Sequence, residues 1–216
     1  MLLKCSLRRL DAVRSEADGN AMYGLVNNGI RNFIVNAHGE EVWLRICEKA
    51  QAREEEFENL TAYDDGVTYA LVGAVSEVLA RSTADVLKVF GQFWVGFSKS
   101  TAIGRLIELR GETLMERIRG LDEMHEQIKL TMPHLDPPSF EFEEMPDGNH
   151  RLRYISSRDG LAPMVAGLLH GMAEECGVKI EVQLIESRAD GAEHDVFNLR
   201  ILSDVATAAC RDGTRA

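Results

Sequence analysis

Residues 114–132 read LMERIRGLDEMHEQIKLTM, and this stretch decides how the rest of the 216-residue chain is interpreted. Its apolar residues recur at intervals of three and four, which is the repeat of one face of an α-helix. The stripe consists of Leu114, Ile118, Leu121, Ile128 and Met132, widened by Met115 and Met124. His125 lies in the middle of it. A buried imidazole needs partners for its nitrogens. His125 is therefore either a core histidine bonded to a carbonyl or carboxylate, or a metal ligand on an apolar wall.

A second group of polar side chains follows in residues 152–158, which read LRYISSR. Because side chains alternate along a strand, Tyr154, Ser156 and Arg158 are expected on one face. A phenol, a hydroxyl and a guanidinium converge well on carboxylates, which arginine binds with two parallel hydrogen bonds. The alternative is a polar sheet face that contacts only water.

The chain on the N-terminal side of this region has mainly helical spacing. Apolar residues from Val26 to Ala37 recur at helical intervals until Gly39. Further helices are predicted over residues 40–50, 65–80, 83–97 and 112–132. Thr83 is a candidate cap of the third of these, and Gly111 marks a break before the last.

The pattern changes after residue 132, because Pro133, Pro137 and Pro138 exclude a continued helix. Residues 140–145 and 150–156 flank a turn at 146–149 and predict a hairpin. A helix over 161–175, ended by Gly177, precedes a second hairpin formed by 178–185 and 196–202. We therefore predict an α+β protein, in which a helical N-terminal subdomain packs on a C-terminal subdomain with an antiparallel sheet and helices.

Composition and charge exclude several classes of protein. Hydrophobic residues make up 45% and charged residues 27%, as in an ordinary globular domain. The net charge of -11 argues against a nucleic-acid partner and against a polybasic membrane contact. The cysteines form no CxxC pair, so we expect reduced thiols in a cytoplasmic protein and no disulfide framework or zinc site. They are Cys5, Cys47, Cys176 and Cys210.

The ends of the chain are expected to lie outside the folded domain. Residues 1–21 lack a secretory signal because charged residues interrupt them, and we predict either a disordered extension or a misassigned start, with Met22 as the working start. Residues 22–202 form the predicted domain. Residues 203–216 show no periodicity and are expected to fray.

These motifs together resemble the H-NOX family, the haem–nitric oxide/oxygen binding domains related to the haem domain of soluble guanylate cyclase. The similarity begins at Met22-Tyr23-Gly24 and extends to about Leu202. It includes FGQFW at 90–94, LDEMH at 121–125, the pair Pro137-Pro138 and YISSR at 154–158. A YxSxR motif alone is a weak signal, whereas the ordered set at the family's spacing is specific.

The resemblance implies a haem b cofactor (iron protoporphyrin IX) buried between the two subdomains. His125 would bind the iron, with Met124 beside it, and Pro137 or Pro138 would press on the porphyrin and distort it. Three side chains would hold the propionates: Tyr154, Ser156 and Arg158. The residues alone are consistent with this, because the apolar stripe would form one wall and buried propionates would need a polar clamp.

The resemblance also implies a gas ligand. Oxygen-binding members of the family place a tyrosine in the distal pocket, whereas the matching residues 160–165 (GLAPMV) carry only apolar side chains. The tyrosine position falls on Pro163 or Met164. The other predicted distal residues are Val26, Ile30, Phe93, Phe97 and Leu168. We therefore expect binding of nitric oxide, and of carbon monoxide, without stable oxygen binding. The alternative is that another donor enters the pocket, such as Tyr23, Tyr63 or Tyr69.

In this family nitric oxide weakens or breaks the iron–histidine bond, so loss of the bond to His125 is expected to free its helix and shift the two halves. No kinase, cyclase or phosphodiesterase pattern occurs in the 216 residues. The resemblance implies a stand-alone bacterial sensor that acts on a separate histidine kinase or diguanylate cyclase, which is an analogy.

Two other classes of function stay open at this point. A haem enzyme would need a distal histidine or arginine for acid–base chemistry, and the predicted distal positions carry neither. His170 lies nearby, but its spacing predicts contact with solvent. A haem-free interaction module would use His125 as a core residue and the YxSxR face to meet acidic groups, and such a protein would be colourless.

Overall fold

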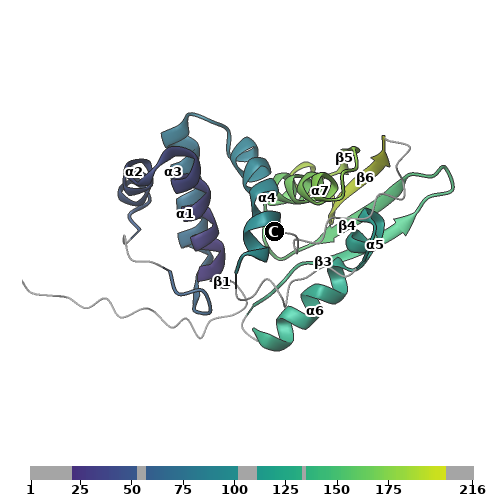
Figure 1. The fold of residues 1–216 in the computed structure, drawn as a ribbon, viewed down its shortest axis with the longest axis horizontal. Helices are drawn as coiled ribbons and strands as arrows, with labels where there is room; N and C mark the ends of the chain where they lie inside the picture. The colour runs from purple at the N-terminus through teal and green to yellow at the C-terminus, as the bar shows by residue number, and fades with distance from the viewer. Residues whose placement is uncertain (1–20, 53–56, 102–110, 133–134, 203–216) are drawn as a thin grey trace, which may run out of the picture.

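The computed structural model describes residues 21–52, 57–101, 111–132 and 135–202, so the predictions for 1–20 and 203–216 lie outside the described residues (Figure 1). The N-terminal part contains β1 (Ala21–Tyr23), α1 (Gly24–His38), α2 (Glu40–Ala50), β2 (Ala62–Asp64), α3 (Asp65–Leu79) and α4 (Thr83–Lys99). The C-terminal part contains α5 (Leu114–Arg119), α6 (Leu121–Thr131), β3 (Ser139–Glu144), β4 (His150–Ile155), α7 (Ala162–Glu175), β5 (Ile180–Glu186), the 3₁₀ helix η1 (Arg188–Asp190) and β6 (Asp195–Ile201).

The ends of the N-terminal helices follow from local chemistry. α1 ends at Gly39, whose φ of 84° is favourable for glycine. The predicted cap of α4 is off by one residue: the side chain of Ser82, not Thr83, accepts a hydrogen bond from the Asp85 N–H. β1 and β2, which the sequence did not predict, pair antiparallel and bring the start of α1 beside the start of α3.

The helix predicted over 112–132 is two helices, α5 and α6, separated at Gly120. α5 begins with a capping box between Thr113 and Glu116. Gly120 stays in the right-handed helical region, with φ of -80° and ψ of -2°. The apolar stripe therefore passes from one helix to the next, which explains why periodicity alone did not reveal the break.

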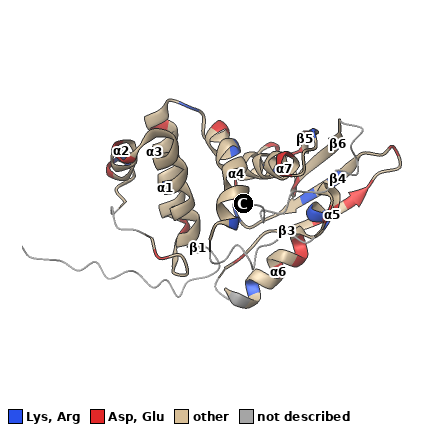
Figure 2. Ribbon diagram, viewed as in Figure 1, with Lys and Arg blue, Asp and Glu red and all other residues tan. Residues whose placement is uncertain are grey.

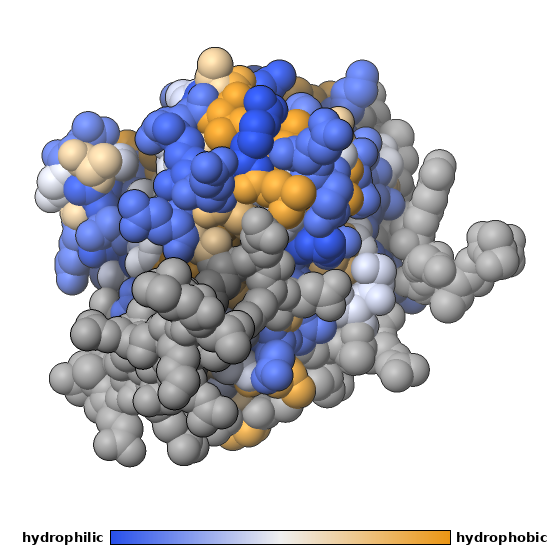
Figure 3. Space-filling view, turned by 90° about the vertical axis from the view of Figure 1, so that its left-hand side faces the viewer, coloured by the Kyte–Doolittle hydropathy of each residue, from blue (hydrophilic) through white to orange (hydrophobic). Residues whose placement is uncertain are grey.

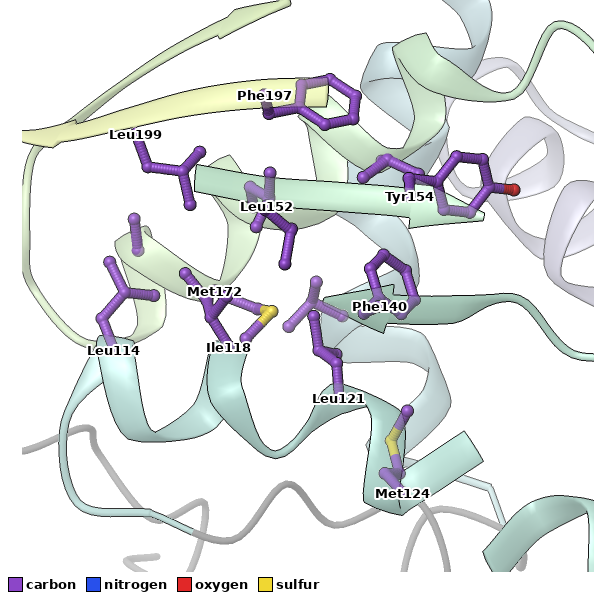
Figure 4. Close-up of a cluster of buried hydrophobic side chains, with 14 of the residues drawn as sticks. Leu114, Ile118, Leu121, Met124, Phe140, Leu152, Tyr154, Met172, Phe197 and Leu199 are labelled. Carbon is purple, nitrogen blue, oxygen red and sulfur yellow. The ribbon is translucent and has the colours of Figure 1, made fainter. Parts of the chain in front are cut away.

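The two predicted hairpins form one antiparallel sheet with the strand order β3-β4-β6-β5. The register pairs Phe140 with Tyr154 and Leu152 with Phe197, so large side chains of three strands share one face. Figure 4 shows this face packed against α5, α6 and α7, with Tyr154 at one end of the row and its hydroxyl pointing out of the cluster. The predicted α+β architecture is confirmed.

The joint between the two parts is formed by α4 and α7, which lie side by side (Figure 1). A Cβ built on Gly167 would collide with the carbonyl oxygen of Lys88, and one on Gly91 would collide with that of Met164. The two backbones are therefore in direct contact, and glycine is required at these positions.

The expectation of four reduced thiols is wrong for Cys176, which is buried and disulfide-bonded. The prediction failed because separation along the sequence does not measure the distance between two cysteines in the fold.

The surface of the described residues agrees with the acidic composition. In Figure 2 the ribbon of α6 is coloured for acidic residues at the end next to α5 and for a basic residue toward its other end, an order that interacts favourably with the helix dipole. Figure 3 shows that the face formed by the N-terminal helices is mainly hydrophilic, with small apolar areas. No helix among the described residues is long and apolar enough to cross a membrane.

Candidate functional site

A cavity of about 500 Å³ lies between the N-terminal helices and the sheet. Its walls are mainly apolar and come from α1, α3, α4, α6, α7 and the segment before β3. Eleven of the fourteen predicted cofactor-binding residues line it: Val26, Ile30, Met124, His125, Pro137, Pro138, Tyr154, Ser156, Arg158, Met164 and Leu168. Residues 107 positions apart in the sequence, such as Ile30 and Pro137, therefore face one space.

Among the described residues that line the cavity, His125 is the one histidine. Its Nδ1 lies 2.8 Å from the carbonyl oxygen of Leu121, one turn earlier in α6. A carbonyl can only accept, so Nδ1 carries the proton and Nε2 is left with a lone pair for a metal. Burial lowers the pKa of His125, although the Leu121 bond and the Asp122 carboxylate act in the opposite direction. The neutral imidazole is the form that binds iron.

Asp122 fixes α6 to the start of β3. Its Oδ1 accepts hydrogen bonds from the Ser139 hydroxyl at 2.7 Å and from the Phe140 N–H at 2.9 Å. These bonds lower the pKa of Asp122. The Phe140 ring lies 5.4 Å from the His125 ring, measured between centroids. The candidate ligand and the strand after the diproline are thus held as neighbours.

The three predicted propionate-binding residues meet at one end of the cavity, but not as residues of one strand. β4 ends at Ile155, so Ser156 and Arg158 lie in the following loop. Tyr154 is 3% exposed, and burial raises the pKa of its phenol although its hydrogen bond to Ser156 lowers it. The Ser156 hydroxyl accepts a hydrogen bond from the Arg158 N–H at 3.1 Å. The loop therefore brings together what strand alternation was expected to align.

Arg158 is a buried junction between three parts of the chain. Its Nε donates to Asp65 Oδ2 at 2.8 Å, and its Nη1 donates to the Asp136 carbonyl at 2.7 Å. Asp65 begins α3, and Asp136 directly precedes the diproline. Sequence reasoning missed Asp65 because it lies 93 residues from Arg158 and belongs to no recognised motif. Its 8% exposure is the structural signal that a buried cation accompanies it.

The wall opposite α6 differs from the prediction in its α4 residues. Phe93 and Phe97 do not line the cavity, and their rings stack on each other with centroids 5.7 Å apart. The lining residues of α4 are Thr83, Leu87, Phe90, Trp94, Val95, Ser98 and Lys99. One residue along a helix rotates the side chain by about 100°, so choosing 93 over 94 selects the neighbouring face. On α7, Met164 lines the cavity and Pro163 does not.

The three tyrosines considered as alternative donors are placed away from this wall. Tyr23 is buried in the core, and the Tyr63 hydroxyl accepts a hydrogen bond from the Glu58 N–H; neither lines the cavity. Tyr69 lines it, but its hydroxyl donates to the carbonyl of Asp159 at 3.1 Å. Its hydroxyl therefore belongs to the end of the cavity that contains Arg158.

The residues present fit a haem. The cavity offers one imidazole nitrogen, apolar walls, and hydroxyl and guanidinium groups gathered at one end, which matches a flat apolar macrocycle with two carboxylates. In the described part of the chain, no group of three or more His, Cys, Asp or Glu side chains could hold a metal ion.

Fold and site together define an H-NOX-type domain, and solved structures share this fold. An H-NOX protein from S. oneidensis in the Fe(II)NO ligation state has a TM-score of 0.77 and 22% identity, covering 84% of this chain and all of that chain. A point mutant of an H-NOX protein from K. algicida, in the unliganded Fe(II) state, has a TM-score of 0.72 and 19% identity, covering 85% of this chain and 98% of that one.

The sequence profile of the Haem-NO-binding family matches residues 23–184, so the chain belongs to this family. Soluble guanylate cyclase gcy-34 of Caenorhabditis elegans is 31% identical over 157 residues, which are 71% of this chain and 23% of that protein. Soluble guanylate cyclase 89Db of Drosophila melanogaster is 24% identical over 170 residues, which are 78% of this chain and 25% of that protein. The chain thus matches about a quarter of the length of these cyclases.

Proposed function

We propose that the chain is a haem-based sensor that binds nitric oxide at ferrous haem b and signals to a separate effector protein, without catalysing a reaction itself. One observation carries the proposal: the Nδ1 of His125 is bound to its own helix, which leaves Nε2 for iron in an apolar cavity. Tyr154, Ser156 and Arg158 carry groups that can bind carboxylates, and they line the same cavity.

Each end of the cavity has a separate task in this proposal. His125 would hold the iron, and Tyr154, Ser156 and Arg158 would hold the propionates. Pro137 and Pro138, which lie between His125 and Tyr154 in the sequence, also line the cavity. Bound haem would supply a ferrous iron able to bind nitric oxide. Asp65 would keep the Arg158 guanidinium in place, because their ion pair is buried.

The apolar wall formed by α1, α4 and α7 supports nitric oxide over oxygen as the ligand. Bound dioxygen needs a hydrogen-bond donor for its partial negative charge, whereas Ile30, Phe90 and Met164 offer none. Three polar side chains that α4 adds are engaged elsewhere: the Thr83 hydroxyl donates to the Ser76 hydroxyl, the Ser98 hydroxyl donates to the Val95 carbonyl, and Lys99 pairs with Glu175. Trp94 carries the one ring N–H of this wall.

Signal transmission would use the attachment of α6. Weakening or loss of the bond between iron and His125 would leave α6 held by its apolar stripe and by Asp122. The helix could then shift against β3, which gives two arrangements that a partner can distinguish. By analogy with the family, we propose a cytoplasmic bacterial sensor whose partner is a histidine kinase or a diguanylate cyclase.

The ligand assignment is tested with His125→Gly. The purified variant should lose the haem Soret band and regain it when imidazole is added, because free imidazole can fill the vacated position. His170→Gly is the matched control, since His170 does not line the cavity, and should keep its haem. Full haem retention by His125→Gly without imidazole would refute the assignment.

Gas selectivity is tested by exposing the ferrous protein to nitric oxide and to air. We expect a stable nitrosyl spectrum and no stable oxygen complex, for wild type and for Trp94→Phe alike, because an indole N–H is not required for nitric oxide. A persistent oxygen complex in wild type that disappears in Trp94→Phe would identify Trp94 as a donor and overturn the assignment of an apolar distal pocket.

A further inference from the structure

Arg188, at the start of η1, reaches across to the loop after β4. Its Nη1 donates to the carbonyl oxygens of Ser156 at 2.8 Å and of Arg158 at 3.2 Å. Its Nη2 lies 2.9 Å from the Asp159 carboxylate. One guanidinium thus binds the main chain of two residues that would hold the propionates, although it contacts neither of their side chains in these bonds.

Arg188 is itself held in place. Its backbone N–H donates to the carboxylate of Asp195 at 3.0 Å, and Asp195 is 5% exposed. The Ser187 hydroxyl caps η1 by accepting the Ala189 N–H at 3.2 Å. The side chain of Arg188 is 29% exposed, so most of it is shielded from water. Such a fixed arginine is a suitable anchor for a loop without secondary structure.

The same loop is held from the opposite side by α3. The Tyr69 hydroxyl donates to the Asp159 carbonyl, and Asp65 binds the Arg158 side chain. Residues 156–159 are therefore suspended between an N-terminal helix and the β5–β6 connection. If Arg188 were removed, the carbonyls of Ser156 and Arg158 would lose its hydrogen bonds, and the contacts from α3 would remain on the opposite side of the loop.

We propose that Arg188 is a positioning residue for the propionate clamp. By binding the carbonyls of Ser156 and Arg158, it sets the backbone from which the hydroxyl and the guanidinium reach the cavity. The inference rests on the proposed haem-binding function. A lysine cannot replace Arg188 fully, because an ammonium lacks the planar fork that serves two carbonyls and a carboxylate together.

The test compares Arg188→Ala, Arg188→Lys and Arg200→Ala in the full chain loaded with haem. Arg200 is the matched control: it belongs to β6, is exposed, and pairs with Glu181 at 2.8 Å without touching the clamp. The rate of haem transfer to excess apomyoglobin should rise about tenfold in Arg188→Ala, by analogy with the loss of groups that orient a cofactor ligand. Arg188→Lys should show an intermediate rise, and Arg200→Ala none.

A second readout separates positioning from general stability. Thermal midpoints are measured for each protein with and without haem, and the propionate bending band is recorded by resonance Raman spectroscopy. A positioning role predicts that Arg188→Ala narrows the gap between the two midpoints and shifts the band. Equal lowering of both midpoints, with unchanged transfer rate and band, would show a purely structural role and overturn the inference.

The outcomes also separate this inference from the proposed function. If wild type takes up no haem, the proposed function is refuted and the inference with it. If wild type holds haem through His125 and Arg188→Ala loses it no faster than Arg200→Ala, the positioning role alone is refuted.

Discussion

The helices α7 and α6 border the same cavity but are attached in different ways. α7 lies backbone to backbone on α4, because glycines such as Gly167 leave no side chain between them. α6 is held by side chains: its apolar stripe and the two hydrogen bonds that Asp122 accepts from Ser139 and Phe140. A backbone contact allows little adjustment, whereas side-chain contacts can rearrange. The contacts of α7 therefore leave it less room to shift than those of α6.

The apolar face of α6 is partly exposed to the cavity. Leu121, Met124 and Ile128 line the cavity together with His125, so a large part of the helix's apolar surface faces the space that haem would fill. Leu169 and Met172 of α7 line the cavity as well and belong to the same apolar cluster, but α7 is in addition held by its backbone contact with α4. The position of α6 should therefore depend on the cavity's contents more than that of α7.

The largest effect is expected where the backbone contact is broken, in Gly167→Ala. The added Cβ would collide with the Lys88 carbonyl, so α7 must move away from α4. Overpacking of this kind costs about 3 kcal/mol, to be measured as the change in free energy of unfolding in urea.

Gly96→Ala on α4 is the matched control. A Cβ there meets nothing within 4 Å, so the gain in helix propensity should stabilise the protein by up to about 1 kcal/mol. If both glycine variants changed the stability alike, the α4–α7 contact would not be a rigid joint.

A smaller effect is expected on the other wall, in Asp122→Ala. Loss of the bonds to Ser139 and Phe140 should lower the free energy of unfolding by about 2 kcal/mol at pH 7. The folded-state pKa of Asp122 is lowered, chiefly by Ser139. Its contribution is therefore present above the unfolded pKa of about 4 and is lost as the pH falls through the folded value.

Urea denaturation at pH 7 and at pH 3 measures this difference between wild type and variant. Glu123→Ala, one residue further along the exposed side of α6, should change stability by less than about 0.5 kcal/mol. A difference for Asp122→Ala that did not shrink toward low pH would contradict the assigned role of its carboxylate.

The smallest effect concerns a titration at the α4–α7 joint. Burial, and then the charge of Lys88, lower the pKa of His170 on α7. A lowered pKa means that the unfolded chain binds the proton first, so stability is fully present above about pH 6.5 and falls as the pH drops through the folded value. Wild type should lose slightly more stability than His170→Gln between pH 8 and pH 5. The opposite sign would show that protonated His170 gains a partner.

The helices could be predicted from periodicity where a long amphipathic pattern meets a clear end, as in residues 40–50, which match α2 to the residue. Periodicity failed to predict a helix break or a strand where the change in structure leaves the apolar pattern of the sequence unchanged. Gly120 keeps the stripe in phase across two helices, and β1 and β2 are three residues each, too short to show alternation. The disulfide of Cys176 was missed because pairing depends on the folded path of the chain.

The motifs in the sequence indicated His125, Tyr154, Ser156 and Arg158 as site candidates, and the structure brings these four residues to one cavity. The residues that support the motif were not predictable. Asp65 and Arg188 lie 93 and 30 positions from Arg158, and neither shows in sequence what it binds. Phe93 was preferred over Trp94 because helical position resolves a face only when the neighbours of the helix are known.

The bond from His125 Nδ1 to Leu121 stays within one helix, and this has a mechanical consequence. The imidazole is hydrogen-bonded to the helix that carries it, so a force on Nε2 would act directly on the main chain of α6. The hydrogen bond at Nδ1 diverts none of the displacement to another element. The ring and α6 would then move together, so a displacement of the ring would appear as a displacement of the whole helix.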